Sequence, residues 1–139
     1  MASFENLMHL RILSLNFEYC STLSTQEMEI LAQGLQSIAS SLKNLALNFN
    51  SCLYLNDQAL EKLSVGLKAL TNLLEINMQC DKCSSIEDFG VERIIDGLGG
   101  LENLESVSLS FQYCALINEP SENGLKMNKN IKHLSFISS

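Results

Sequence analysis

The sequence is poor in the features that mark membrane, secreted or nucleic-acid-binding proteins. No apolar run approaches the length that spans a bilayer, so we expect no membrane insertion. The first residues carry no basic leader, and His9 and Arg11 interrupt their apolar run, which predicts neither a secretory signal nor a transit peptide. Nine Lys and Arg against sixteen Asp and Glu give a net charge of -7, which disfavours nucleic acid and anionic membranes as partners. The expected partners are proteins.

Tryptophan is absent, and proline occurs once in 139 residues. The hydrophobic fraction of 46% and the charged fraction of 18% lie far from the disordered range, so we predict a single folded domain over residues 1–139. Five cysteines are an odd number in a chain with no expected signal, which favours a reducing compartment. We therefore expect an intracellular protein, with the cytoplasm as the first choice.

One pattern returns in register along the chain. Leu42 to Cys52 read Leu-x-x-Leu-x-Leu-x-Phe-x-x-Cys, and copies of this frame begin near residues 10, 42, 73, 104 and 131. A partial repeat precedes residue 10, where Phe4 and Leu7 take the positions of the last turn of a helix. Self-similarity at this period predicts a solenoid.

In each copy, apolar and polar residues first alternate as in a strand, and the apolar residues then recur with the period of a helix. In the second copy Leu45, Leu47 and Phe49 face one way, as in a strand with one buried face. Apolar residues then recur at spacings of three and four, which predicts an amphipathic helix of about three turns. These stripes are Met28, Leu31, Leu35 and Ile38; Leu60, Leu63, Leu67 and Leu70; and Val91, Ile94, Leu98 and Leu101.

The residues at the ends of the expected helices also recur. Thr25, Asp57 and Asp88 occupy equivalent sites and predict N-terminal caps. Pro120 falls at the corresponding first helical position of the fourth copy, whose span is four residues shorter, so we expect a last helix one turn shorter. Glycines in register predict that the helix backbone packs closely on the next repeat. They are Gly34, Gly66 and Gly97.

These strand and helix units resemble the leucine-rich repeats of the ribonuclease-inhibitor-like superfamily, over nearly all of the chain. Family repeats run to about 28 or 29 residues, whereas here the period is 31 or 32. The longer unit is similar to a subtype abundant in ciliated protists. The resemblance implies an α/β solenoid with a parallel sheet on the concave face and helices on the convex face, about four repeats plus a final strand. It also implies protein binding and transfers no active site.

Cys80 and Cys83 form a Cys-x-x-Cys pair, which in another context indicates a redox pair or half of a zinc site. Cys83 is the cysteine of its repeat, and Cys80 takes the inward place that Phe49 has in the copy before it. We therefore predict two buried structural thiols, with no metal and no cofactor. The repeat cysteines are expected to form a buried ladder of Cys20, Cys52, Cys83 and Cys114.

The histidines are badly placed for catalysis. His9 precedes the first strand and His133 lies on the fifth. At the usual strand spacing these two strands are about 19 Å apart. His133 shares a column with Ser106 and Glu75, but the serine lies between the other two, whereas a triad needs the imidazole in the middle. We predict no catalytic residues and no enzymatic activity.

The outward strand positions and the residues just after them are the candidate partner-binding surface. They are small and polar, with two carboxylates and two tyrosines at one rim, and tyrosines are frequent anchors in interfaces. The same pattern also fits an ordinary solvated sheet face. The candidates are Asn16, Glu18, Tyr19, Asn48, Asn50, Asn77, Gln79, Asp81, Ser110, Gln112, Tyr113, His133 and Ile137.

The sequence therefore predicts a non-enzymatic protein-interaction module or scaffold. Neither end shows the polar capping repeat with which solenoids usually close. The first alternative is accordingly a structural subunit that a large assembly covers at its ends. The second is an inhibitor that meets a basic enzyme through its acidic charge.

Overall fold

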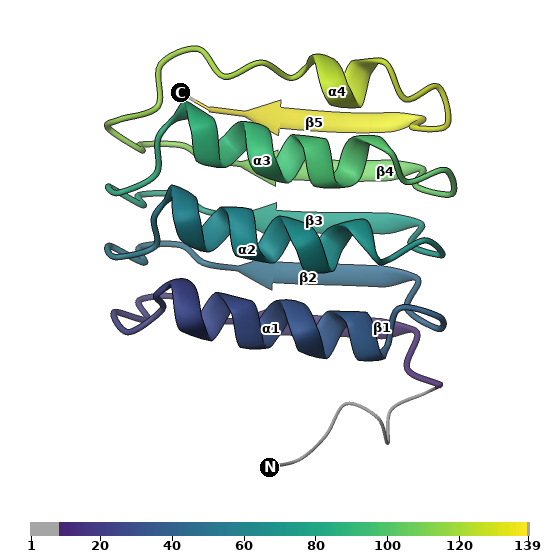
Figure 1. Ribbon diagram of the computed structural model, residues 1–139. Helices are drawn as coiled ribbons and strands as arrows, with labels where there is room; N and C mark the ends of the chain where they lie inside the picture. Colours follow the sequence, from purple (N-terminus) through teal and green to yellow (C-terminus); the bar gives the residue numbers. More distant parts are fainter. Residues whose placement is uncertain (1–8, 139) are drawn as a thin grey trace.

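The computed structural model describes residues 9–138 as an α/β structure in which a parallel sheet alternates with helices, a solenoid-like arrangement (Figure 1). The helices all cover one side of the sheet, and each strand pairs with the strands before and after it in the sequence. The strands are β1 (Ile12–Asn16), β2 (Asn44–Asn48), β3 (Glu75–Gln79), β4 (Ser106–Ser110) and β5 (His133–Ile137). The helices are α1 (Thr25–Ser37), α2 (Asp57–Lys68), α3 (Asp88–Gly99) and α4 (Asn123–Lys126). The turn expected at Phe4 and Leu7 lies outside the described residues.

The strands pair in the register that the repeat predicts. Leu13 faces Leu45, which faces Ile76, and the same row continues through Val107 to Leu134. Side chains of this row point into the core in the middle strands, where Leu45 is 2% exposed. The predicted alternation of inward and outward side chains is therefore confirmed for β1 to β4, whereas in β5 Leu134 is 37% exposed.

A second inward row carries the largest core side chains. The rings of Phe17 and Phe49 stack with centroids 5.5 Å apart, and the rings of Phe111 and Phe136 lie 6.3 Å apart. Cys80 lies between the two pairs and is fully buried. The expectation that this thiol replaces an inward aromatic ring is confirmed, and the row runs Phe17, Phe49, Cys80 and Phe111, whereas Phe136 belongs to the neighbouring row, where it pairs with Leu109.

The helix caps lie one residue earlier than the sequence predicted. The N-caps are Ser24, Asn56 and Glu87, so the assignment of Thr25, Asp57 and Asp88 was wrong. The Asn56 side chain accepts the N–H of Ala59 at 3.0 Å, as a cap should. Asp57 instead reaches the next repeat, where it accepts the N–H of Glu87 at 2.8 Å.

The fourth repeat departs further from the expectation. Its helix α4 is a single turn, and Pro120 lies three residues before it rather than at its first position. Side chains of α3 hold the backbone before α4: Asp88 accepts from Asn118 and Glu119, and Glu92 accepts from Ser121. A proline also disfavours helical geometry in the residue before it, here Glu119. The shorter repeat therefore runs as an extended loop.

Glycines permit close helix packing, but on the preceding repeat rather than on the next. A Cβ on Gly66 would lie 2.7 Å from the Cα of Ala32 in α1, and one on Gly97 would lie 3.0 Å from the carbonyl oxygen of Ser64 in α2. The contact at Gly66 is too short for a side chain, and at Gly97 the neighbouring backbone would have to shift to admit one. Gly34 lies buried in α1, the first described helix.

Replacing a stacked core ring should be costly, whereas replacing an outward side chain on the same sheet should not. Phe49 has no exposed surface, so Phe49→Ala should lower the free energy of unfolding by about 3 to 5 kcal/mol. Asn77→Ala removes an exposed side chain of β3 and should change it by less than about 0.5 kcal/mol. Urea titrations of the two variants measure this, and equal shifts of the midpoint would contradict the inward assignment of Phe49.

Candidate functional site

The outer face of the sheet is a grid of polar side chains in register. Its central row runs Ser14, Ala46, Asn77, Ser108 and Ser135. The rows on either side include Asn16, Asn48, Gln79 and Ser110 at the strand ends, with His133 at the start of β5 and Ile137 at its end. The strand residues among the candidates thus come together on one continuous surface.

This face is hollowed over β1, β2 and β3. Two adjacent hollows of about 220 and 210 Å³ share Ser14, Ala46 and Asn77 in their lining. Ala46 is the smallest side chain of the central row, and its size explains why the surface dips there. The candidates predicted from the sequence did not include Ser14 and Ala46, although their small size was visible in the repeat.

The candidates just after the strands hold neighbouring repeats together. The side chain of Asn50 accepts the N–H of Asp81 at 2.8 Å, and the side chain of Asp81 in turn accepts the N–H of Gln112 at 2.8 Å. Asp81 also accepts the Ser110 hydroxyl, and the Asn50 amide donates to Gln79. These five residues therefore have a structural role at the ends of the strands.

Two further candidates act within their own repeat. The side chains of Asn16 and Asn48 accept the backbone N–H groups of Glu18 and Asn50, each at 2.9 Å. Such turns satisfy backbone donors where the regular ladder ends. Asn77 lies exposed in the middle of β3, in the part of the face that is hollowed.

Tyr19 and Tyr113 lie in the loops after β1 and β4, and each is 73% exposed. Both adopt a left-handed backbone, with φ of 62° and 60°, as do Ser51 and Lys82 at the same position of the other repeats. For residues other than glycine, this backbone conformation is less stable than the right-handed one by about 1 to 2 kcal/mol. In the first three repeats the N–H of this residue pairs with the next repeat, as from Tyr19 to the Asn50 carbonyl at 2.9 Å, and this bond offsets the cost.

The repeat cysteines are hydrogen-bond donors as well as core residues. The thiols of Cys52, Cys83 and Cys114 each donate to the carbonyl of the inward residue in the preceding repeat, at 3.1, 3.1 and 3.0 Å. The predicted burial is confirmed for these three, whereas Cys20 in the first repeat is only partly buried. The repeat predicted the burial of these thiols, whereas their role as donors had no signal in the sequence.

Burial favours the neutral thiols. It raises the pKa of Cys52 from about 9 to about 11, and it raises the pKa of Cys114 to about 11 as well. The pKa of Cys80 is also raised, chiefly by burial. Cys52 and Cys114 therefore keep their protons at neutral pH and continue to donate.

Another hollow, of about 440 Å³, opens between the loops that follow α2 and α3. Its lining mixes Lys68 with Asp96 and Glu102, and Gly100 leaves open space beside it. The nearby amides of Asn72 and Asn103 donate to the carbonyls of the preceding repeat. These side chains tie the loops together and do not converge on a common point.

The column of Glu75, Ser106 and His133 does not have the order of a catalytic triad. Glu75 pairs with Ser106 and Ser106 with His133, so the serine lies between the acid and the imidazole. Within residues 9–138, no group of three or more His, Cys, Asp or Glu side chains could hold a metal ion. Among the same residues, no helix is long and apolar enough to cross a membrane.

Comparison with known proteins leaves the family open. No family model matches the chain, and a search of curated proteins found no match.

The role of Asp81 can be tested against the equivalent residue of the first repeat. Asp81→Ala leaves the Gln112 N–H without its acceptor and should lower the free energy of unfolding by about 1 to 3 kcal/mol. Asp81→Asn keeps an acceptor oxygen and should lose less. Glu18→Ala changes an exposed side chain of the same column and should stay within about 0.5 kcal/mol. A similar loss in urea titrations for Asp81→Ala and Glu18→Ala would contradict the structural role.

The raised thiol pKa values predict a loss of stability in alkali. A group whose pKa is raised on folding stabilises the fold fully below its unfolded pKa and loses that contribution as the pH passes its folded pKa. The free energy of unfolding should therefore fall between about pH 9 and pH 11. The fall should be shallower in a Cys52→Ala, Cys114→Ala variant and unchanged in Cys20→Ala, as measured by urea titration at each pH. Identical slopes in all three proteins would exclude the thiols as its cause.

Proposed function

We propose that this chain is a leucine-rich-repeat solenoid that acts as a non-enzymatic protein-interaction module, and that the outer face of the sheet is its binding surface. The observation that carries the proposal is the hollowed polar face over β1 to β3, centred on Ala46. It presents exposed side chains from neighbouring strands on a framework fixed by the hydrogen bonds at the strand ends. A rigid framework reduces the entropy lost when a partner binds.

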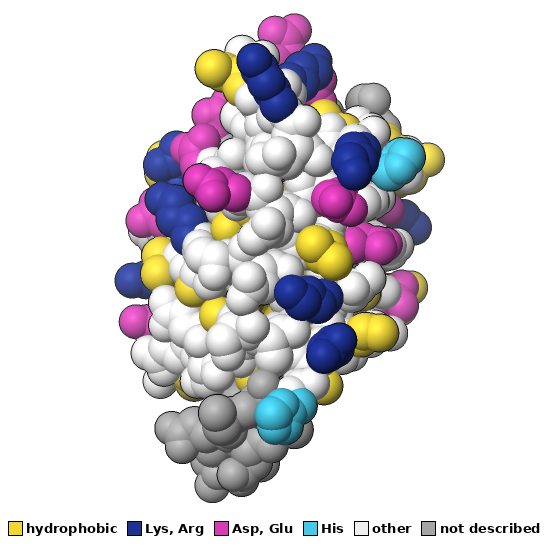
Figure 2. All heavy atoms as spheres, turned by 90° about the vertical axis from the view of Figure 1, so that its right-hand side faces the viewer, with side chains coloured by type: hydrophobic (Ala, Val, Ile, Leu, Met, Phe, Trp, Pro, Cys, Tyr) yellow, Lys and Arg dark blue, Asp and Glu magenta, His cyan; other side chains and the backbone are white. Residues whose placement is uncertain are grey.

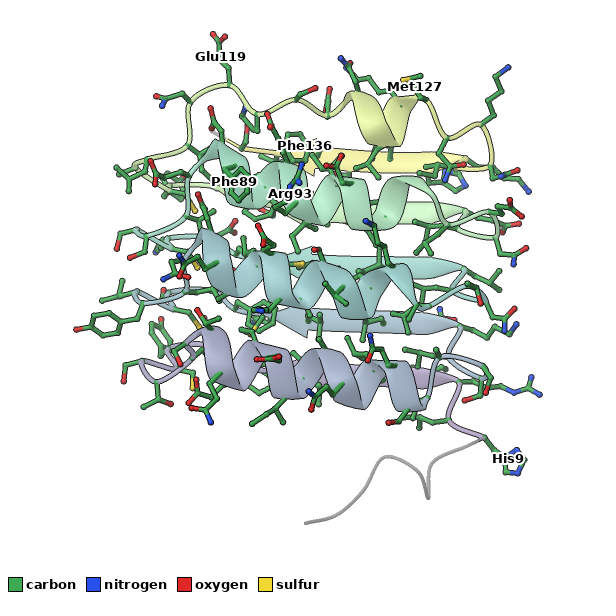
Figure 3. The ribbon with its side chains drawn as sticks, in the orientation of Figure 1. His9, Phe89, Arg93, Glu119, Met127 and Phe136 are labelled. Atoms are coloured by element: carbon green, nitrogen blue, oxygen red, sulfur yellow. The ribbon has the colours of Figure 1, made fainter. Side chains whose placement is uncertain are left out.

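A second candidate function is supported by β5. Leu134 is 37% exposed, whereas Leu45, Ile76 and Val107 in the same inward row are at most 2% exposed. Met127, at the end of α4, is 78% exposed, and it projects from the outside of the fourth repeat (Figure 3). An assembly that packs against this end would make the chain a structural subunit.

Five free cysteines, four of them buried, accord with a protein of a reducing compartment. We place the interaction module inside the cell on that basis.

An arginine introduced into the hollow should block a partner on the sheet face. Ala46→Arg and Asn77→Arg should each reduce capture of the partner by about tenfold or more, because a bulky charge at the centre of an interface prevents close packing. Val65→Arg adds the same charge on the exposed side of α2 and should leave capture unchanged. Quantitative mass spectrometry after affinity purification of the intact chain compares the variants, with circular dichroism to confirm folding.

The same experiment separates the two candidates. If all three folded variants retain every captured protein, the sheet face is not the binding surface. Hydrogen exchange then tests β5: slower exchange of residues 133–137 in the complex than in the isolated chain would establish packing at that end.

A further inference from the structure

The loops that lead from strands to helices carry an unusual concentration of exposed aromatic and aliphatic side chains. All three tyrosines of the sequence lie there, Tyr19, Tyr54 and Tyr113, with 65 to 73% of their surface exposed. Leu53 and Leu116 are exposed in the same loops, and Phe89 is exposed in the first turn of α3. These loops stack on one side of the molecule, the left-hand side of Figure 1. Aromatic residues grouped on a surface are typical of interfaces.

The charge of the molecule is segregated in the same direction. We call the strand-to-helix loops, with the first residue of each helix, the acidic-aromatic edge: residues 17–25, 49–57, 80–88 and 111–123. This edge holds seven carboxylates and one basic residue, Lys82. The opposite edge comprises residues 9–11 and the helix-to-strand loops with the last residue of each helix, and it holds six Lys or Arg against two carboxylates. Figure 2, which faces that opposite edge, shows its basic side chains lying among acidic ones.

Apolar and acidic groups meet in one hollow of the acidic-aromatic edge. The hollow has a volume of about 220 Å³ and is lined by Phe89 and Leu116 together with the carboxylates of Asp57, Glu87 and Asp88. Small-molecule pockets usually have volumes of about 300 to 1,000 Å³, so this hollow suits a single side chain better. Long basic side chains fit such a place because they bury an apolar stem and keep a charged head beside the carboxylates.

The chain itself contains an example of this kind of contact. The guanidinium of Arg93 lies 5.1 Å from the centroid of the Phe89 ring and pairs with Asp96. Figure 3 shows Arg93 beside Phe89 on α3. A guanidinium is attracted both by the face of an aromatic ring and by a carboxylate, and the acidic-aromatic edge offers both to an incoming arginine.

We propose that the acidic-aromatic edge is a second interaction surface, separate from the outer face of the sheet, and that it binds an arginine-rich segment of a protein partner. Arginine side chains pair with the carboxylates of the edge and stack on its exposed tyrosines. The charge complementarity makes association fast at low ionic strength and slower as salt is added. The surface goes beyond the proposed sheet-face function and does not depend on it.

A labelled peptide of alternating arginine and serine tests the proposal with the intact chain. Fluorescence anisotropy should show binding that weakens as the ionic strength rises, and the same peptide with citrulline in place of arginine should not bind. Glu18→Gln, Glu87→Gln and Glu119→Gln together remove three charges of the edge and should weaken binding about tenfold, as three exposed ion pairs of ordinary strength would. A matched control removes three charges elsewhere, by Glu29→Gln, Glu61→Gln and Glu102→Gln, and should have little effect.

The aromatic contribution needs its own variant. Tyr54→Ser with Tyr113→Asn should weaken binding by a further tenfold or so. Asparagine is suited to position 113 because it tolerates the left-handed backbone there.

Four results would overturn the proposal. They are the absence of peptide binding, equal losses from the two charge-removing sets, no loss in the tyrosine variant, and oligomers of the chain itself by light scattering at low ionic strength. The last would identify a second copy, docked through its basic edge, as the occupant.

Discussion

The fold depends on satisfying the backbone where each parallel strand ends. A strand of five residues pairs only a few backbone N–H and C=O groups of its repeat with the neighbouring strands. The hydrogen bonding between repeats must therefore continue into the loops. The chain does this with side chains of one repeat that accept N–H groups of the next: Asn50 and Asp81 beyond the strands, and Asp57 and Asp88 beside the helices. A buried or partly buried backbone N–H or C=O group without a hydrogen-bond partner would destabilise the fold by more than one hydrogen bond stabilises it. Nearest-neighbour pairing of this kind explains why hydrogen-bond acceptors stand at equivalent positions of neighbouring repeats, at Asn50 and Asp81 and at Asp57 and Asp88.

The same constraint explains how far the sequence could predict the structure. The apolar rows were predictable because burial follows the repeat, as Leu45 and Phe49 show. The roles of the polar residues were not, since a carboxylate near a helix start fits a cap and a bond to the next repeat equally well in sequence. Asp57 and Asp88 were misassigned for this reason. Several candidate binding residues, Asn50 and Asp81 among them, were likewise chosen for polarity that the structure uses internally.

The fourth repeat shows what happens when a unit loses four residues. The sequence suggested the loss of one helical turn, which would keep the apolar stripe in phase. The structure instead keeps Leu125 buried on a single turn and lets the residues before it run extended, held by Asp88 and Glu92. A helix needs several turns before its hydrogen bonds offset the cost of starting it. Hydrogen bonds from the preceding helix therefore hold this segment in place of a short helix, which would be unstable by itself.

The repetition in a solenoid by itself places different kinds of residue on different edges of the molecule. Each loop type stacks on one edge, so a bias that is small in a single repeat accumulates along the molecule. Here one edge gains carboxylates and all three tyrosines, while the opposite edge gains lysines. The left-handed residue after each strand adds to this effect. At this position the side chains of Tyr19 and Tyr113 lie in loops where no neighbouring side chain buries them. An exposed aromatic side chain gains nothing for the isolated fold, and the middle repeats have Ser51 and Lys82 at the same left-handed position. Its presence in both outer repeats is better explained by a contact with something outside the chain.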